Sequence, residues 1–338
     1  MLNERKDNLF GSLRISSYFC MCNKKYMEEN IKFSVTIPAF KDKYLKETID
    51  SVLAQTYQNY EVVIVNDASP YNLDSIVSQY SDPRIRYFKN KKNCGARDVV
   101  DNWNICLSHA TGDYLICMGD DDNLTPRCLQ DFAELIGKYP ELDLFHARSE
   151  IIDDDSKFVC LLEERPEWES VYSLVYTLND SGLGSYLYNV EALRRDGGFF
   201  KLPYGWSSDL VSAIIAARRH GAANTQEPGF LYRGTRHSIS HDIKSIEGKV
   251  KANQMAWAWI RDFISQTPAV TPEDKQLERL IPARIDEKFF RKIDELIEFD
   301  IRKNFGQRAP FWLRNRREFG LSLKRYLLCV LRSFRYRL

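Results

Sequence analysis

From Lys32 onward, short strand-like segments alternate with amphipathic ones, and this alternation limits the fold more than any other feature of the sequence. The segments FSVTIPAF, YEVVIVNDAS, RIRYFKN and DYLICM are typical of strands, because they are rich in apolar, β-branched and aromatic residues. Residues 42–56, 96–110 and 125–140 carry apolar positions at helical spacing. Strands that alternate with helices pair in parallel through right-handed crossovers. We therefore expect an α/β fold with a central, mostly parallel sheet flanked by helices.

The pattern changes after Glu141. A long strand pattern is followed by a short turn and a returning strand, so we expect an antiparallel hairpin there. A last strand leads into a polar loop near His237, and the chain from about Ile243 is mostly helical in pattern. These changes predict an N-terminal extension, an α/β domain with two halves and a helical C-terminal region, at residues 1–30, 31–242 (31–140 and 141–242) and 243–338.

Composition excludes several classes of protein. Of the 338 residues, 44% are hydrophobic, which is enough for a domain with a real core. The net charge is +1, but residues 309–338 carry eight Lys and Arg against one acid, and the rest carries 40 against 46. An acidic body with a basic tail is not typical of a nucleic-acid-binding protein, so no nucleic acid is expected as a partner. The cysteines lack zinc-site spacing and favour a reducing cytosolic compartment.

Acidic residues follow two of the predicted parallel strands. Asp67 comes directly after the second strand, and Asp120, Asp121 and Asp122 follow the fourth. Ligands of such sheets bind outside the carboxyl ends of the strands, so we expect these carboxylates to meet at one edge. Two carboxylates of the triplet could bind a hard cation, Mg²⁺ or Mn²⁺. The alternatives are a solvated loop for the triplet and a turn or cap residue for Asp67.

A second aspartate triplet, residues 153–155, falls in the turn of the predicted hairpin. Aspartate is common in turns because its side chain bonds nearby backbone N–H groups. We interpret this triplet as structural and expect it at the far end of the domain from the edge that carries Asp120.

Two further segments could carry chemistry. Asp209 opens an amphipathic helix, either as a first-turn acid behind a Ser207 or Ser208 cap, or as a general base for an acceptor hydroxyl. The segment LYRGTRHSISH could be a basic loop against phosphates with a histidine as metal ligand, or simply a solvated basic loop. Its candidates are Arg233, Arg236, His237 and His241.

The last residues form an amphipathic pattern with basic groups beside its apolar face. The apolar positions are Leu323, Leu327, Val330, Leu331 and Phe334, and the basic ones are Lys324, Arg325, Arg332 and Arg335. This pattern is typical of an interfacial helix on anionic lipid, so we expect peripheral contact with the cytoplasmic face of a membrane. The alternative is a helix docked on the body or on a second subunit.

These pieces, in this order, resemble the family-2 glycosyltransferases of the GT-A fold. The resemblance covers about residues 32–240 and rests on four separated motifs, at 33–69, 93–95, 102–126 and 205–221. It implies a Rossmann-like nucleotide-diphospho-sugar transferase that moves a sugar, with inversion, to a glycan or lipid-linked acceptor in cell-surface polysaccharide synthesis. It also makes a UDP-sugar the default donor, although no residue names the base or the sugar.

The resemblance also implies roles for particular residues. Asp209 would be the catalytic base, and Mn²⁺ or Mg²⁺ would be the cofactor on the donor diphosphate. The expected nucleotide-sugar contacts are Pro38, Ala39, Phe40, Asp67, Gly95, Asp120, Asp121 and Arg233. The expected metal ligands are Asp120, Asp122 and His237, with Asp121 as an alternative ligand. Two departures from the family pattern are Gly119, where an aspartate is common, and Ser208, where a glutamate is common.

Two other functions fit less well. A sugar nucleotidyltransferase usually has a glycine-rich phosphate loop after the first strand, and TIPAFKDKY contains no glycine. A non-catalytic scaffold would not need an intact triplet together with Asp209.

Overall fold

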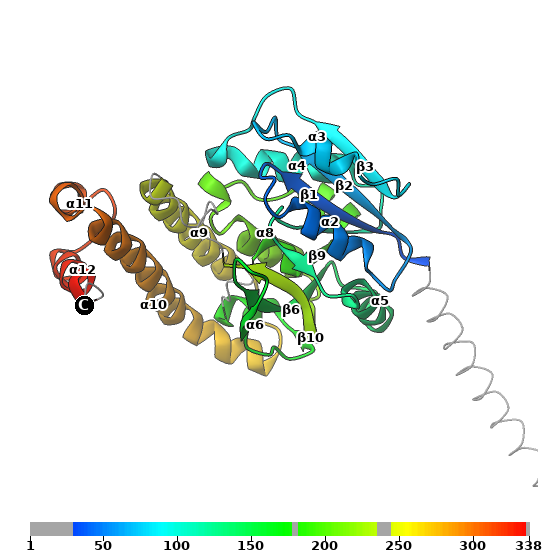
Figure 1. Ribbon diagram of the computed structural model, residues 1–338. Helices are drawn as coiled ribbons and strands as arrows, with labels where there is room; N and C mark the ends of the chain where they lie inside the picture. Colours follow the sequence, from blue (N-terminus) through cyan, green and yellow to red (C-terminus); the bar gives the residue numbers. More distant parts are fainter. Residues whose placement is uncertain (1–29, 178–181, 235–244, 336–338) are drawn as a thin grey trace, which may run out of the picture.

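The computed structural model describes residues 30–177, 182–234 and 245–335. A ten-stranded sheet runs through the α/β part in the order β3-β2-β1-β4-β9-β6-β10-β5, with β7 beside β6 and β8 beside β10 (Figure 1). The strands are β1 (Phe33–Ala39), β2 (Tyr60–Asn66), β3 (Ile85–Lys89), β4 (Tyr114–Cys117), β5 (Asn123–Leu124), β6 (Leu144–Ile152), β7 (Phe158–Leu161), β8 (Trp168–Glu169), β9 (Tyr186–Asn189) and β10 (Ala222–Arg233).

The first half of the sheet has the predicted parallel arrangement. Strands β3, β2, β1 and β4 are all parallel, with Ala39 opposite Asn66 and Thr36 opposite Cys117. The connecting helices are α2 (Leu45–Leu53), α3 (Leu73–Val77) and α4 (Val99–His109). The predicted α/β class is confirmed, and the carboxyl ends of β1, β2 and β4 lie at one edge.

The second half is mixed, so the sheet is parallel only in part. Strand β9 is antiparallel to both β4 and β6, whereas β10 is parallel to β6. The hairpin β6–β7 is antiparallel, as expected. Antiparallel neighbours can be joined by a short turn, as β6 and β7 are, whereas β9 is antiparallel to two strands that lie far before it in the chain.

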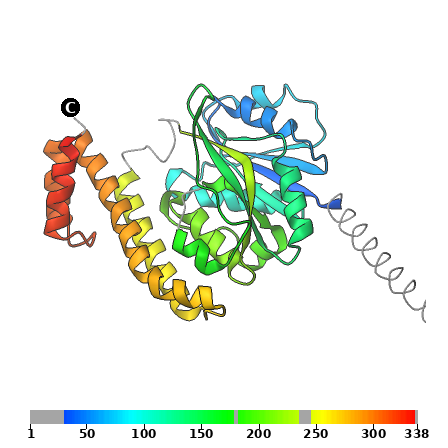
Figure 2. The same ribbon diagram turned by 90° about the horizontal axis from the view of Figure 1, so that it is seen from below.

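Helices cover both faces of the sheet (Figure 2). Helices α2 and α5 (Cys128–Lys138) pack on one face through residues such as Ile49 and Phe132. Helices α4, α6 (Val171–Thr177), α8 (Ser208–Ala217) and α9 (Ile246–Gln266) contribute to the core on the other face, and α7 (Val190–Arg195) follows β9. Burial of these apolar stripes from water is the main favourable term that holds the layers together.

The C-terminal region has a small core of its own. Helix α10 (Pro272–Lys303) starts at a Thr271 cap with proline at its first position, and α11 (Phe305–Asn315) and α12 (Leu323–Arg335) pack at its far end (Figure 1). Trp312 is fully buried there and donates its indole N–H to Asp300 at 2.7 Å. None of the helices formed by the described residues combines the length and apolar character needed to cross a bilayer.

Helix α12 does not dock through its most apolar face. Tyr326, Cys329 and Ser333 face the body and are buried, whereas Leu323, Leu327 and Leu331 are 51%, 50% and 64% exposed. Arg325 anchors the helix by an ion pair with Asp294 on α10. Helix α12 is therefore docked on the body of the same chain, as the alternative expected, with Val330 packed against the C-terminal core, while three leucines of its apolar face stay exposed.

Gly112 supports the parallel sheet by its lack of a side chain. A Cβ atom at this position would lie 2.6 Å from the Lys32 carbonyl oxygen and 2.8 Å from the Phe33 carbonyl carbon, both in the backbone at the start of β1. We expect Gly112→Ala to lower the free energy of unfolding by about 1–3 kcal/mol, because rigid backbone cannot move aside. Urea unfolding measures the change.

The matched control is Gly306→Ala on α11, where a new Cβ meets nothing within 4 Å. It should change stability by less than about 0.5 kcal/mol or increase it slightly. Equal effects of the two substitutions would contradict the packing argument.

Candidate functional site

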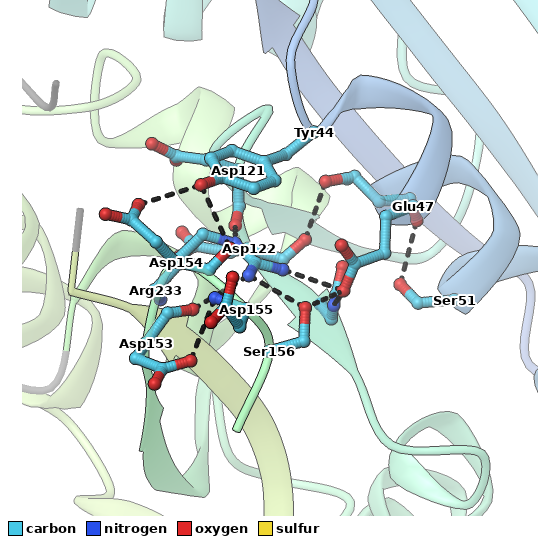
Figure 3. Close-up of polar contacts among 12 residues, drawn as sticks. Tyr44, Glu47, Ser51, Asp121, Asp122, Asp153, Asp154, Asp155, Ser156 and Arg233 are labelled. Atoms are coloured by element: carbon cyan, nitrogen blue, oxygen red, sulfur yellow. Dashed lines mark hydrogen bonds and ion pairs between the residues drawn. The ribbon is translucent and has the colours of Figure 1, made fainter. Parts of the chain in front are cut away.

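The carboxyl edge of the sheet brings together segments that are far apart in the sequence. The carboxyl ends of β1, β4, β6 and β10 lie there, and the aspartate triplet at 120–122 follows β4. Figure 3 shows Asp121 and Asp122 beside Arg233 and the turn that holds Asp153. Asp120 and Asp122 are almost completely buried, with 4% and 6% of their surfaces exposed. The prediction that distant carboxylates meet at this edge is confirmed.

Asp120 shapes the loop that follows β1. Its Oδ2 atom accepts hydrogen bonds from the backbone N–H groups of Phe40 and Lys41, both at 2.6 Å. Charge-assisted bonds of this kind are among the strongest in proteins. Asp120 therefore joins the triplet to the end of β1, where Pro38, Ala39 and Phe40 are the residues that the sequence singled out for nucleotide binding; Pro38 and Ala39 belong to the strand, and only Phe40 follows it.

Asp121 and Asp122 each have one carboxylate oxygen engaged by the protein. Asp121 Oδ2 lies 2.6 Å from the Lys41 ammonium, and Asp122 Oδ1 accepts the Arg233 backbone N–H at 3.0 Å. Asp121 Oδ1 and Asp122 Oδ2 accept no hydrogen bond from residues 30–177, 182–234 or 245–335. A Cβ atom on Gly119 would lie 2.8 Å from Asp121 Oδ1 and 2.9 Å from Asp122 Oδ2, so both oxygens lie close to Gly119, whose lack of a side chain leaves them room.

This pair of oxygens fits a hard divalent cation. Mg²⁺ and Mn²⁺ are commonly held by one or two carboxylates, with water and substrate phosphates completing the shell. No cluster of three or more His, Cys, Asp or Glu side chains capable of holding a metal occurs among the described residues. Two carboxylate oxygens supply part of the shell of such a cation, and water or phosphate oxygens can complete it.

The pKa values of the triplet reflect crowding of like charge. Burial raises the pKa of Asp120, and the charge of Asp121 adds to the shift while Lys41 opposes it. Burial also raises the pKa of Asp122 well above its ordinary value, again with Asp121 adding to the shift. The site therefore favours bound positive charge.

The Arg233 side chain links several segments of the protein and does not face solvent, as a phosphate ligand would. Its side chain is fully buried, stacks over the Tyr44 ring and donates from Nε to the Asp121 carbonyl at 2.8 Å. Its other donors reach the Glu47 carboxylate at 2.7 Å and, in the hairpin turn, the Asp153 carbonyl and the Ser156 hydroxyl (Figure 3). The prediction that Arg233 contacts phosphate is therefore not supported by its position.

The second triplet, residues 153–155, lies beside the first and not at the far end of the domain. Strand β6 is parallel to β10, with Ile152 opposite Arg233, so the turn after β6 reaches the same edge. Asp153 accepts the backbone N–H groups of Asp155 and Lys157, both at 2.9 Å, as expected of a turn residue. The Tyr44 hydroxyl donates to Asp154 at 2.7 Å. The turn was predicted correctly, and its location was wrong.

Asp67 is held by the segment that contains Gly95. The Asp67 carboxylate accepts the Asn90 side-chain amide at 2.8 Å and the Cys94 backbone N–H at 2.9 Å. Gly95, the residue after Cys94, has a φ of 81°, a backbone conformation that favours glycine. Two elements predicted to bind nucleotide thus lie side by side at the end of β2.

An exposed aromatic pair stands next to this segment. Phe40 and Tyr71 are 38% and 48% exposed, and their ring centroids are 6.4 Å apart. Exposed aromatic rings at a ligand-binding edge offer a stacking surface. The sequence indicated Phe40, but Tyr71 was missed because it lies in an irregular turn with no periodic pattern.

Asp209 lies in the first turn of α8, after a strained approach. Tyr204, Gly205 and Ser207 all have positive φ, between 63° and 66°. Neither serine acts as the expected side-chain cap: Ser207 makes no cap bond, and the Ser208 hydroxyl accepts the Leu202 N–H at 3.0 Å. Strained backbone of this kind is frequent at functional sites because it fixes a side chain in place.

His237, Arg236 and His241 lie outside the described residues. The sequence also missed Tyr44, Glu47 and Ser156, whose roles depend on contacts across long sequence separations.

The model of the family "Glycosyl transferase family 2" matches residues 34–193. These residues are a family 2 glycosyltransferase domain. They include β1 to β9 and both aspartate triplets, whereas Asp209 and Arg233 lie beyond the matched part.

Relatives of this glycosyltransferase domain have related names. EpsE of Bacillus subtilis, named as a glycosyltransferase, is 34% identical over 117 residues, 33% of this chain and 41% of its own length. WcaA of Escherichia coli, named as a glycosyl transferase of colanic acid biosynthesis, is 38% identical over 109 residues, 31% and 38% of the two lengths. The chain thus spans about two fifths of these curated relatives.

Solved structures share the fold over most of the chain. TarS 1–349 of S. aureus in complex with UDP-GlcNAc has a TM-score of 0.62 at 16% identity and covers 90% of this chain and 92% of its own. The mannosyltransferase PcManGT of Pyrobaculum calidifontis, in complex with GDP-Man and Mn²⁺, has a TM-score of 0.54 at 14% identity, with coverage of 90% and 87%. At these identities the likeness shows the fold.

Replacing Asp122 with Asn should stabilise the metal-free glycosyltransferase domain at neutral pH. The folded-state pKa of Asp122 is raised, so the stability that its protonated form contributes is present at low pH and is lost as pH rises through that pKa. Asn removes the charge and keeps an acceptor for the Arg233 N–H, so we expect a gain of about 1–2 kcal/mol. Urea unfolding in EDTA from acidic to neutral pH measures it.

The control comes from the second triplet. The Asp155 side chain is 74% exposed, and Asp155→Asn should change stability by less than about 0.5 kcal/mol. A stability loss in Asp122→Asn, or an equal gain in both variants, would contradict the crowding argument.

Proposed function

We propose that the protein is a glycosyltransferase that moves a sugar, with inversion, from a nucleotide-diphospho-sugar to an acceptor hydroxyl. The observation that carries the proposal is the pair of carboxylate oxygens on Asp121 and Asp122 that accept no hydrogen bond from the described residues and lie beside the loop that Asp120 holds. A metal-bound diphosphate held by these two oxygens would place the nucleotide along that loop and the sugar toward the second half of the sheet. The family 2 domain supports this reading.

In this proposal the nucleotide lies at the ends of β1 and β2. Phe40 and Tyr71 supply an exposed aromatic surface for the base, and the Asp67 backbone N–H bonds the carbonyl of Ala39, the residue before Phe40. A UDP-sugar is the first donor to test, because the TarS structure contains UDP-GlcNAc. The GDP-Man in the PcManGT structure makes a GDP-sugar the second.

Asp121 and Asp122 would hold Mn²⁺ or Mg²⁺, with His237 as a further candidate ligand. When bound, the cation would offset the negative charge of the departing nucleoside diphosphate. The geometry favours Asp121 over Asp120 as the partner of Asp122, because Asp120 Oδ2 already accepts two backbone N–H groups. Asp120 then acts by positioning the nucleotide loop.

Asp209 would accept the proton of the acceptor hydroxyl as that oxygen attacks the anomeric carbon. The attack comes from the face opposite the leaving diphosphate, so the configuration inverts. The acceptor in this proposal is a glycan or a lipid-linked hydroxyl in polysaccharide synthesis, as the name of WcaA suggests for that relative. The strained turn before α8 would fix the position of the Asp209 carboxylate.

Asp209→Asn should lower the rate of sugar transfer by about 10²- to 10⁴-fold, because the amide cannot take the proton. Binding of the nucleotide should change less than twofold, since Asp209 does not belong to the nucleotide loop. Product analysis with a panel of UDP- and GDP-sugars, Mn²⁺ and candidate acceptors measures transfer, and calorimetry measures binding.

The matched control is Glu191→Gln, which removes a first-turn acid from α7. Its transfer rate should equal that of the unmodified protein. Normal transfer by Asp209→Asn would refute the assignment of the base. Formation of a nucleotide-sugar from a sugar phosphate and a nucleoside triphosphate would instead indicate a nucleotidyltransferase.

We also propose that the protein works on the cytoplasmic face of a membrane and contacts it through α12. The exposed stripe of Leu323, Leu327 and Leu331 is continued by the Phe334–Phe305 pair, whose ring centroids are 5.0 Å apart. Three large aliphatic side chains in one stripe are unusual on a surface that faces only water.

The charge beside this stripe favours an anionic lipid surface over a second copy of the chain. Lys324 lies next to the stripe, and Arg314, Arg316 and Arg317 lie just before α12. Within the described residues, none of these four cations has a carboxylate partner within ion-pair distance. A symmetric dimer would bring these cations against one another, whereas anionic headgroups would neutralise them.

Leu327→Glu combined with Leu331→Glu should abolish binding to phosphatidylcholine vesicles that contain phosphatidylglycerol. Both side chains are at least half exposed, so thermal unfolding should be unchanged. Vesicle sedimentation measures binding.

The control pairs Val270→Glu with Leu280→Glu, which are 77% and 46% exposed and add the same charge elsewhere. Control binding should persist. Loss in both variants, or a stable dimer that the α12 variant disrupts without any vesicle binding, would overturn the proposal.

A further inference from the structure

Lys41 connects the nucleotide loop to the aspartate triplet twice. Its backbone N–H donates to Asp120 Oδ2 at 2.6 Å, and its ammonium lies 2.6 Å from Asp121 Oδ2 and 3.6 Å from Asp120 Oδ1. The ammonium therefore sits between two carboxylates of the triplet, next to the oxygens proposed to hold a metal.

Among the described residues, Lys41 is the one cation that forms an ion pair with a carboxylate of this triplet. Arg233 is close by, but its guanidinium bonds the Asp121 carbonyl and the Glu47 carboxylate. The Lys41 side chain is 29% exposed, so it lies at the rim of the site and its long stem can move.

We propose that Lys41 is the internal counter-cation of the triplet. Its ammonium competes with the divalent metal for the carboxylates until the donor binds. The inference rests on the proposed function. In the donor-free protein the ammonium offsets the crowded carboxylates, and metal binding to Asp121 must overcome its charge. When metal and donor bind together, the Lys41 ammonium leaves Asp121 and lies against the diphosphate. The phosphate oxygens then neutralise the positive charges of both the ammonium and the metal.

This exchange predicts that loss of the Lys41 charge changes the affinities for two ligands, the metal and the diphosphate, in opposite directions. Removing the ammonium relieves repulsion toward the metal when no donor is present. It also removes an attraction for the diphosphate once the metal is in place. If Lys41 only held the loop in place, its replacement would weaken the binding of both the metal and the diphosphate.

The experiment uses Lys41→Met in the full chain, with folding checked by thermal unfolding. Without nucleotide, we expect Mn²⁺ to bind about tenfold more tightly than to the unmodified protein, because two cations a few ångströms apart at a protein surface repel by more than 1.4 kcal/mol. At saturating Mn²⁺, UDP should bind about tenfold more weakly. Electron paramagnetic resonance of free Mn²⁺ and calorimetry with UDP measure the two affinities.

Two variants serve as controls. Lys43→Met removes the same charge from the same loop, but Lys43 pairs with Asp154 at 3.9 Å, so both affinities should stay within about twofold. Lys41→Arg keeps the charge and should restore the metal affinity of the unmodified protein. If Lys43→Met tightens Mn²⁺ binding as much as Lys41→Met does, the effect is a general one of charge and the inference is overturned.

A measurement on the unmodified protein covers the case in which Lys41→Met does not fold. Addition of Mn²⁺ without donor should increase the rate at which an amine-acylating reagent modifies Lys41, with Lys43 as the internal reference in mass spectrometry. No increase relative to Lys43 would overturn the inference. If the unmodified protein binds Mn²⁺ and Lys41→Met binds it no more tightly, the inference is overturned and the proposed function stays intact. If neither protein binds Mn²⁺, both the inference and the proposed function are overturned.

Discussion

The edge of the sheet holds three adjacent carboxylates, and the arrangement around them depends on how their charge is offset. Two backbone N–H groups bond Asp120, the Lys41 ammonium lies against Asp121, and a third backbone N–H bonds Asp122. Each of these donors comes from a loop or strand end that the bond also fixes in place. The same contacts therefore shape the chain at Phe40 and Lys41, directly after β1, and tie the end of β10 to the end of β4.

Arg233 extends this arrangement into the second half of the sheet. Its buried guanidinium joins the Asp121 backbone, the α2 residue Glu47 and the turn of the β6–β7 hairpin. A buried cation is tolerated only when its donors are satisfied and a charge partner is present, and Glu47 supplies that charge. These contacts leave Asp121 Oδ1 and Asp122 Oδ2 close to Gly119, where the lack of a side chain makes room for them.

Several elements could be predicted from local pattern alone. Strands β1, β2 and β4 and their helices have strong periodicity, and parallel pairing then places Asp67 and the 120–122 triplet at one edge. The turn at 153–155 was also predictable, because aspartate bonds its own backbone there. Its position was not predictable, because it depends on the parallel pairing of β6 with β10, which are separated by about 80 residues in the chain. The buried role of Arg233 was hidden for the same reason.

The sequence by itself determined the α/β class, the edge at which acidic residues gather and the amphipathic character of the tail. Each of these follows from spacing within a short segment, which local geometry converts into strand, helix or turn. Only the tertiary structure decided which carboxylate oxygens are engaged, that Lys41 lies among them, and that α12 turns Tyr326, Cys329 and Ser333 toward the body and leaves its leucines exposed. Those outcomes depend on which distant segments pack together, and packing is a property of the whole chain.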